Sequence, residues 1–294
     1  MIEAGESPKL SLVVATVGRT AELVRLLDSL TKQTRSDFEV IIVDQNEDGR
    51  LDAIISSFMP RLTILRLRSA RGLSRARNQG LRWCRGEIIG MPDDDCWYPP
   101  ALLQTVCDTF AIKSGCGYVV GQWLDEEGAP LSRTFRDSSR WMSSLDLWLK
   151  GFSICVFLKA EVVSRIGYFD ERLGVGAQTS WGSGEETDYL IRIANADYKG
   201  WYEPSCIVYH PRVVRAFDER AIERALSYGR GTGFVLRKHS VGLVMLLRFV
   251  LRPFGGVLLG IATLRWSKAR FYWSVLRGRV EGWMDAEHEA ANNI

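Results

Sequence analysis

The sequence predicts an α/β protein with a mostly parallel central sheet flanked by helices, followed by a C-terminal helical extension. Short β-branched runs alternate with amphipathic segments over the first third of the chain, which is typical of strands joined by crossover helices. Acidic residues follow two of these runs. Beyond about residue 215 the composition changes to aliphatic stretches interleaved with basic residues. We therefore expect a sheet domain over 1–215 and a helical extension over 216–294.

The expected elements follow in order from residue type and spacing. Apolar runs bounded by Gly, Pro or polar turns predict strands, at 10–16, 38–44, 62–67, 87–90, 118–124, 152–158 and 207–211. Leucines at three- and four-residue spacing predict a first helix that Thr20 caps. Further helices are expected at 53–59, 72–85, after 100, at 141–150 and from 185. This alternation predicts a sheet covered on both faces.

Composition limits the classes to which the protein can belong. With 294 residues, 46% of them hydrophobic and 25% charged, the chain can bury a substantial core. Its six cysteines include no C-x-x-C pair, so neither a zinc site nor a disulfide framework is expected. The N-terminal residues lack the basic and apolar regions of a signal peptide, and we expect the sheet domain to stay in the cytosol.

Three consecutive carboxylates, Asp93, Asp94 and Asp95, follow the apolar run at 87–90. Adjacent carboxylates repel one another and are costly to desolvate, so they need a cation or exposure to water. A solvated acidic turn is one explanation. However, ligand sites in open α/β sheets lie at the carboxyl ends of strands. Oxygen ligands suit Mg²⁺ or Mn²⁺, and these ions suit a bound diphosphate. The cluster therefore predicts a metal–diphosphate site.

Five segments, in this order, resemble the motifs of the inverting nucleotide-sugar glycosyltransferases of family 2, which have the GT-A fold. Residues 14–19 resemble the first-strand motif that contacts the nucleoside, and residues 43–44 resemble the second-strand acid that binds the base. Residues 72–80 resemble the G-x-S-x-A-R-N-x-G loop and helix, and residues 92–95 resemble the D-x-D region. Residues 185–190 resemble the helix start that supplies the catalytic base. The resemblance covers residues 10 to 210, about two-thirds of the chain.

The resemblance implies a donor site and a metal site in the sheet domain. The donor would be a UDP-, dTDP- or GDP-linked sugar, and the contacts expected for it come from Thr16, Arg19, Asp44, Arg77, Asp93 and Asp94. Which of Asp93 and Asp94 meets the ribose is left open. A Mn²⁺ or Mg²⁺ ion would be held by Asp95, and His210 is a further ligand or phosphate contact. A structural role is the alternative for His210, because a lone histidine is more often structural.

The resemblance also implies a general base at the helix start from 185. A carboxylate must take the proton from the acceptor hydroxyl as it attacks the anomeric carbon, which contributes about 10²–10⁴ in rate. Glu186 is the expected base, and Asp188 is expected to position the acceptor or the helix. The alternative for these acids is favourable charge placement in a first helical turn. The Gly-rich segment before them, from Leu173 to Gly184, is expected to be a functional loop.

The extension is strongly basic. Residues 212–279 hold 14 Lys and Arg against three Asp and Glu, a net charge of +11 in a protein whose total is +3. Arg248, Arg252 and Pro253 interrupt each apolar window that could cross a membrane. Basic residues between Leu, Phe and Trp suit helices that lie in the interface of an anionic membrane. A helical subdomain packed on the sheet or on a second subunit is the alternative. The aliphatic runs favour lipid over nucleic acid.

The sequence therefore predicts a metal-dependent inverting glycosyltransferase, peripheral on the cytosolic face of a membrane. It would move one sugar from a nucleotide-diphosphate sugar to a lipid-linked glycan in polysaccharide biosynthesis. A nucleotidyltransferase with the same metal site is an alternative, although the Gly-rich first loop with a Lys is missing. A non-catalytic membrane adaptor on a transferase-like fold is a second alternative, and the intact acids count against it. No nucleic-acid partner is expected, and the oligomeric state is left open.

Overall fold

The computed structural model describes residues 7–130, 138–150, 153–212 and 217–292. The chain forms two compact units. The first comprises Met1–Arg71, Arg75–Tyr168 and Tyr189–Arg212, and the second comprises Gly72–Ser74, Phe169–Asp188 and Val213–Ile294. The expected boundary at 215 lies beside the break at Arg212. The sequence analysis does not predict that Gly72–Ser74 and Phe169–Asp188 belong to the second unit.

The first unit is built on an eight-stranded sheet of order β3-β2-β1-β4-β7-β5-β8-β6. Its strands are β1 Leu10–Thr16, β2 Phe38–Asp44, β3 Thr63–Arg68, β4 Ile88–Gly90, β5 Cys116–Leu124, β6 Arg140–Trp141, β7 Val156–Lys159 and β8 Lys199–Tyr209. Neighbours in the β3-β2-β1-β4 half are parallel, as are β5 and β8. Strand β7 is antiparallel to β4 and β5, and β6 is antiparallel to β8. The prediction of a mostly parallel sheet is confirmed.

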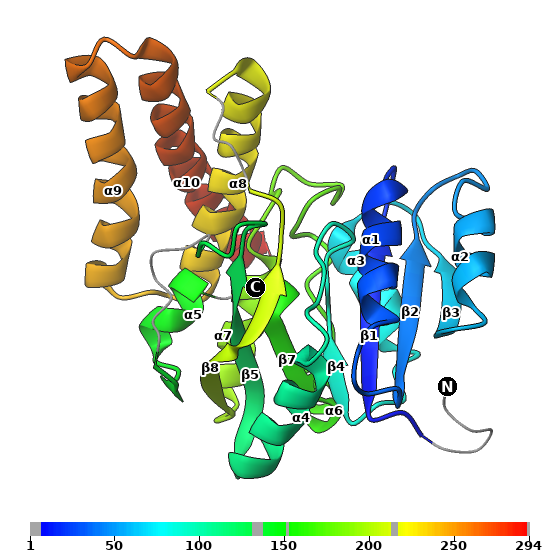
Figure 1. Ribbon diagram of the computed structural model, residues 1–294. Coiled ribbons are helices and arrows are strands. Elements are labelled where there is room, and N and C mark those ends of the chain that lie inside the picture. The colour runs from blue at the N-terminus through cyan, green and yellow to red at the C-terminus, as the bar shows by residue number, and fades with distance from the viewer. Residues whose placement is uncertain (1–6, 131–137, 151–152, 213–216, 293–294) are drawn as a thin grey trace. The chain divides into compact units, whose positions relative to one another are not determined.

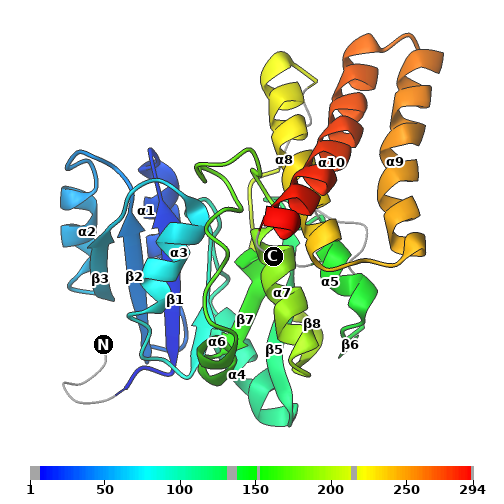
Figure 2. The ribbon, with the colours of Figure 1, turned by 180° about the vertical axis from the view of Figure 1, so that it is seen from behind.

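Helices cover both faces of this sheet. They are α1 Ala21–Leu30, α2 Asp52–Phe58, α3 Leu73–Leu81, α4 Leu102–Ile112, α5 Ser144–Lys150 and α6 Ala160–Ile166, with a 3₁₀ turn at Ser153–Cys155. Helices α1 and α4 lie on the face turned to the viewer in Figure 1, and α3 and α6 lie on the face seen in Figure 2. The leucines that predicted α1 are all buried: Leu23, Leu26, Leu27 and Leu30. Their spacing places them on one side of the helix, which packs on the sheet.

Several predicted elements differ from the structure. The strand expected at 207–211 is the end of a longer strand, β8, which begins at Lys199 and ends at Tyr209, and the helix expected at 72–85 ends at Leu81. The helix expected at 141–150 begins at Ser144, because Arg140 and Trp141 pair with β8 as a short edge strand. The strand expected at 152–158 begins at Val156 after the 3₁₀ turn, and its first residue lies outside the described residues. Val156, Phe157 and Leu158 are buried as expected, whereas Trp141 and Leu145 are exposed, and pairing with β8 decides the backbone conformation at Arg140 and Trp141.

The strand register sets the position of the site. Thr16 pairs with Asp44 at the carboxyl ends of β1 and β2, and Leu12 pairs with Gly90 at the end of β4. Because these strands are parallel, the loops that follow them leave from the same edge of the sheet. The acidic segment after Gly90 is one of these loops.

The second unit contains three long helices, α8 Glu219–Lys238, α9 Leu243–Ala262 and α10 Trp266–Asn292. Helix α10 lies between α8 and α9 in both views (Figures 1 and 2). Helices α8 and α10 approach closely at glycines. A Cβ atom at Gly233 would lie 2.1 Å from the Arg279 carbonyl oxygen, and one at Gly282 would lie 1.9 Å from that of Arg230. No side chain fits at either position, so the contact depends on glycine.

Helix α9 is continuous where the sequence analysis expects an interruption. It runs unbroken through Pro253 for 20 residues, and by length and composition it could cross a membrane. The expectation that Arg248, Arg252 and Pro253 interrupt each apolar window is therefore wrong for the helix itself. The two arginines are four residues apart, so they share one face and leave the others apolar. A proline forfeits one backbone hydrogen bond, and the rest of α9 continues around it.

Candidate functional site

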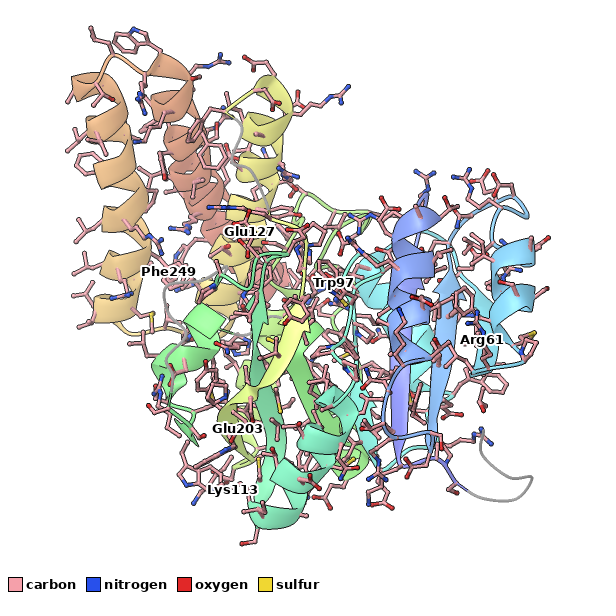
Figure 3. The ribbon with its side chains drawn as sticks, viewed as in Figure 1. Arg61, Trp97, Lys113, Glu127, Glu203 and Phe249 are labelled. Atoms are coloured by element: carbon pink, nitrogen blue, oxygen red, sulfur yellow. The ribbon has the colours of Figure 1, made fainter. Side chains whose placement is uncertain are left out.

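The acidic loop and the end of β8 meet in the first unit. Backbone hydrogen bonds join Trp97 and Tyr209 in both directions, each with an N···O distance of 3.0 Å, and the two rings stack with centroids 5.6 Å apart. Trp97 is labelled in Figure 3. This bridge places His210, the residue after Tyr209, beside Asp95. Ligand atoms of Asp93, Asp95 and His210 all lie within 4.8 Å of one another.

The His210 ring is oriented for binding. Its Nδ1 lies 2.7 Å from the Pro211 carbonyl oxygen, which can only accept a hydrogen bond, so Nδ1 carries the proton. Its Nε2 lies 3.3 Å from Asp95 Oδ1. The edge of the ring packs on Trp123, with centroids 5.4 Å apart. A histidine held through one nitrogen with the other directed at carboxylates has the usual arrangement of a metal ligand.

Arginines neutralise much of the acidic triplet. Arg19 Nη1 lies 2.7 Å from Asp94 Oδ1 and 2.5 Å from Asp95 Oδ2. The nearly inaccessible Arg77 places Nη2 3.1 Å from Asp93 Oδ1. The expectation that Arg19 and Arg77 contact the phosphate or the nucleoside of the donor stays a prediction. In this structure both guanidinium groups bind the carboxylates and offset part of their negative charge.

The three titratable groups are shifted in different directions. Burial raises the pKa of Asp94, and Thr16 and Arg19 only partly oppose it. Burial would also raise the pKa of Asp95, but hydrogen bonds and charge from His210 and Arg19 outweigh it and lower that pKa. Burial would lower the pKa of His210, but the Asp95 carboxylate outweighs it and raises that pKa. Asp95 and His210 therefore form the charged pair, and Asp94 lies apart from it.

Asp44, expected to bind the base, is buried and already paired. Its Oδ2 lies 2.6 Å from Arg66 Nη2 and 3.0 Å from Arg68 Nη1. Its Oδ1 accepts hydrogen bonds from the backbone and side-chain nitrogens of Asn46, at 2.9 and 2.8 Å. Asn46 Oδ1 in turn accepts from the Gly18 backbone N–H at 2.7 Å. Asp44 thus joins the loops after β1 and β2, and its contact with a base stays a prediction.

The expected catalytic acids lie in the second unit, at the start of helix α7 (Glu185–Asn195). The helix begins after Gly184, whose φ of 98° favours glycine, and a Cβ there would lie 2.8 Å from Val235 Cγ2. Glu186 is half-buried. Asp188 is fully buried, and its Oδ1 lies 2.8 Å from Lys238 Nζ and 2.9 Å from His239 Nε2. These contacts anchor the helix start.

The loop before α7 is also anchored within the second unit. Trp181 stacks on Phe234 of α8 with centroids 3.9 Å apart, and its backbone oxygen accepts from the Gly174 N–H. Ser74 Oγ donates to the Leu173 oxygen at 2.6 Å. The G-x-S segment and the Gly-rich loop are therefore one structural element, although about 100 residues separate them in the chain.

Four residues that the sequence analysis did not select contribute here. Arg25 donates from Nη2 to the Asp95 carbonyl oxygen at 2.8 Å and lies 4.1 Å over the Trp97 ring. Trp97 makes the bridge to β8. In the second unit, Lys238 and His239 hold Asp188, and Lys238 Nζ also lies 2.9 Å from Asp170 Oδ2. The sequence signal for Trp97 is its place two residues after the acidic triplet. No local pattern identifies Lys238 or His239.

The donor set of the first unit fits a divalent cation. Two carboxylates and an imidazole converge there, and oxygen ligands with one nitrogen suit Mn²⁺ or Mg²⁺. Asp93, expected as a donor contact, belongs to this cluster with Asp95 and His210, whereas Asp94 contacts Arg19.

The model of the family described as Glycosyl transferase family 2 matches residues 11–156, which contain β1 to β5 and the acidic loop. The chain belongs to glycosyltransferase family 2. An uncharacterized glycosyltransferase of Haemophilus influenzae is 40% identical over 91 residues, which are 31% of each chain. The GalNAc(5)-diNAcBac-PP-undecaprenol beta-1,3-glucosyltransferase of Campylobacter jejuni is 29% identical over 134 residues, covering 44% of this chain and 42% of that one.

The family 2 match agrees with the likeness to solved structures. The mannosyltransferase PcManGT from Pyrobaculum calidifontis, solved in complex with GDP-Man and Mn²⁺, superposes with a TM-score of 0.65 at 17% identity, over 96% of this chain and 88% of that one. This likeness shows the GT-A fold. The matched part covers only 31% of the Haemophilus protein's length, so the family relationship does not by itself define the activity of the whole protein.

Proposed function

We propose that the protein is a metal-dependent inverting glycosyltransferase that moves one sugar from a nucleotide-diphosphate sugar to an acceptor hydroxyl. The observation that carries this proposal is the convergence of Asp93, Asp95 and His210 at the carboxyl edge of the family 2 sheet. Family membership favours sugar transfer over nucleotidyl transfer. The GDP-Man in the PcManGT complex supports a nucleotide-sugar donor.

The first unit would bind the donor. Asp93, Asp95 and His210 would hold Mn²⁺ or Mg²⁺, which supplies charge neutralisation for the leaving diphosphate. Arg19 and Arg77 keep the carboxylates in place and add positive charge where the diphosphate would lie. Thr16 and Asp44, paired at the ends of β1 and β2, would border the nucleoside.

The second unit would supply the base. The Glu186 carboxylate accepts the proton of the acceptor hydroxyl. The hydroxyl oxygen forms its bond to the anomeric carbon as the bond to the diphosphate breaks on the opposite face, which inverts the configuration. Asp188 has no exposed surface from which to reach an acceptor. We assign it the positioning of the helix start, through Lys238 and His239.

A lipid-linked glycan is the proposed acceptor. The undecaprenol-linked substrate in the name of the Campylobacter relative supports this choice. The composition of α9 supports it as well, because its outer residues are apolar and exposed, including Val244 at 84% and Leu243 at 69%. Exposed apolar surface on this scale marks an interaction site. Transfer would take place on the cytosolic face of the membrane.

A transfer assay tests the proposed function. Labelled UDP-, dTDP- and GDP-sugars would be incubated with the protein, Mn²⁺ and a bacterial membrane extract. One donor is expected to yield label that partitions into organic solvent, with the opposite anomeric configuration to the donor. Transfer of a nucleotide group in place of the sugar would contradict the proposal.

Metal binding is expected to depend on pH through His210. A metal needs the unprotonated ring, and the pKa of His210 is raised by Asp95, so protons compete with the metal below that raised pKa. Mn²⁺ affinity should rise by up to about tenfold per pH unit until the ring is deprotonated, because one proton is displaced. Calorimetric titration from pH 6 to pH 8.5 would measure this. His210→Gln should remove the dependence, and an equal slope in that variant would exclude His210 as a ligand.

In the metal-free protein, the contribution of His210 to folding stability should fall as pH rises over the range in which Mn²⁺ affinity rises. A group whose folded pKa is raised contributes stability that is present below its unfolded pKa and lost as pH rises through the folded value. A group whose pKa is lowered, such as Asp95, contributes stability that is lost as pH falls through the lowered value. The Asp95–His210 pair is therefore intact between these two values. Above the raised pKa, Mn²⁺ should replace the stabilisation that the pair has lost.

Helices α9 and α10 are expected to bind the membrane in its plane. Arg248 and Arg252 share a face of α9, so they can extend to headgroups while the apolar face inserts. Each basic group near an anionic surface adds about 1 kcal/mol. Co-sedimentation with vesicles should require anionic lipid and fall with added salt. Because α9 is long enough to cross a bilayer, release only by detergent would show that it spans the membrane.

A further inference from the structure

A cavity of about 220 Å³ lies within the second unit, between α8, α9 and α10. Its walls are apolar and come from all three helices: Leu236 of α8, Leu246, Phe249 and Val250 of α9, and Val280 and Trp283 of α10. Phe249 is labelled in Figure 3. The cavity is smaller than the about 300–1,000 Å³ typical of pockets that enclose drug-sized ligands. It therefore suits a short length of hydrocarbon and not a nucleotide sugar.

Arg279 brings a positive charge to this apolar cavity. Its Nη1 donates to the Phe249 carbonyl oxygen, and its guanidinium carbon lies 5.0 Å from the centre of the Phe249 ring. Its Nε is buried and has no hydrogen-bond acceptor among the described residues. The charged group that influences it is another cation, Arg252, and no described carboxylate forms an ion pair with it.

This arrangement is costly for the protein alone. Burial and the charge of Arg252 lower the pKa of Arg279 to about 10, so the group stays charged at neutral pH. Arg279 is half-buried, and such a charge without an opposite charge costs free energy that an apolar side chain of similar size would not. An anion bound at Arg279 would supply the missing acceptor for Nε and offset the repulsion from Arg252. The adjacent cavity would take an apolar group attached to that anion.

We propose that this cavity and Arg279 bind the lipid carrier of the acceptor, with its phosphate at the guanidinium and the first part of its hydrocarbon chain between the helices. This assignment deepens the proposed function and rests on it. The exposed face of α9 suits bulk lipid, whereas a cavity lined by three helices and bordered by a cation without a counter-charge suits a single phosphorylated chain. The unit that binds the carrier also holds Glu186, the proposed base.

Binding of farnesyl phosphate, below its micelle concentration, to the full-length protein tests the proposal. We expect saturable binding. Farnesol and inorganic phosphate, each of which lacks one half of the ligand, should bind at least about tenfold more weakly, the scale of one charge-assisted hydrogen bond. Equal binding of farnesol would exclude a role for Arg279. Equal or tighter binding of a short-chain phosphatidic acid would assign the cavity to membrane lipid and overturn the carrier assignment.

Two variants and a matched control locate the ligand. Arg279→Met, which removes the charge, and Val250→Phe, which fills the cavity, should each weaken farnesyl phosphate binding at least about tenfold. Arg265→Met removes a charge from an exposed position in the same unit and should leave binding unchanged. Unchanged binding in Arg279→Met, or equal losses in Arg279→Met and Arg265→Met, would overturn the proposal.

Thermal stability separates binding from a structural role. If Arg279 is kept for its ligand, Arg279→Met should be at least as stable as the natural protein, because a half-buried cation without a counter-charge is removed. A lower melting temperature would show that its bond to Phe249 is structural and would contradict the assignment. Nucleotide-sugar binding should be the same in all variants. Loss of carrier binding with donor binding intact is therefore distinguishable from failure of the proposed function.

Discussion

Asp95→Asn is expected to abolish Mn²⁺-supported donor binding and to reduce turnover by more than about 100-fold. Changes to residues that merely support metal ligands cost about 10–100-fold, and Asp95 is placed to be a ligand itself, with Oδ1 3.3 Å from His210 Nε2 and Oδ2 2.5 Å from Arg19. Asn keeps the shape and removes the charge. Calorimetry with Mn²⁺ and steady-state kinetics would measure the two effects.

A surface acid provides the control for this variant. Asp28 pairs with Lys32 on the exposed face of α1, so Asp28→Asn should leave Mn²⁺ binding and turnover unchanged. The circular dichroism spectra of both variants should match that of the natural protein. Full activity of the natural protein in excess EDTA would show that the acidic cluster has another role.

Glu186→Gln is expected to keep donor and metal binding and to lower turnover by about 10²–10⁴, the contribution of a positioned general base. The amide cannot accept the proton of the acceptor hydroxyl, although it occupies nearly the same volume. Single-turnover kinetics at saturating donor would isolate the chemical step. Glu161→Gln, a charge-matched change on an exposed side chain, should have no effect.

Asp188→Asn separates the two acids of this helix start. Asp188 is fully buried between Lys238 and His239, so loss of its charge should destabilise the protein by up to about 3 kcal/mol. Turnover should fall only as far as the loss of Asp188 moves Glu186 away from its position at the helix start. A large loss of turnover in Asp188→Asn at unchanged melting temperature, with Glu186→Gln active, would assign the base to Asp188.

The strand ends and the acidic cluster could be predicted because their signals are local. The β-branched run of residues 10–16 corresponds to β1 without a shift, and the run of residues 38–44 corresponds to β2. Parallel pairing then places their carboxyl ends at one edge whatever the rest of the chain does. The orientation of three consecutive acids is different. Whether Asp93 or Asp94 faces His210 depends on the Trp97–Tyr209 bridge, which joins residues more than 100 positions apart.

The partners of the second unit could not be predicted for the same physical reason. Lys238 and His239 end a 20-residue helix that carries no signal for Asp188, 50 positions earlier. The counter-charge of a buried acid is set by tertiary packing and not by spacing in the chain. The continuity of α9 could not be predicted because a proline inside a helical pattern indicates an interruption, whereas in α9 the apolar residues on either side of Pro253 keep the helix favourable.

The central claim, donor binding that depends on a metal held by the acidic cluster, is tested most directly by thermal unfolding with a panel of UDP-, dTDP- and GDP-sugars. A ligand that binds only the folded protein stabilises it by about 2.7 kcal/mol at 100 times its Kd. This should raise the melting temperature by several degrees, at about 2–4 °C per kcal/mol for a protein somewhat smaller than this one. We expect one sugar nucleotide to do so with Mn²⁺ and to lose the effect in EDTA or in Asp95→Asn. Equal stabilisation in EDTA, or none by any member of the panel, would contradict the claim.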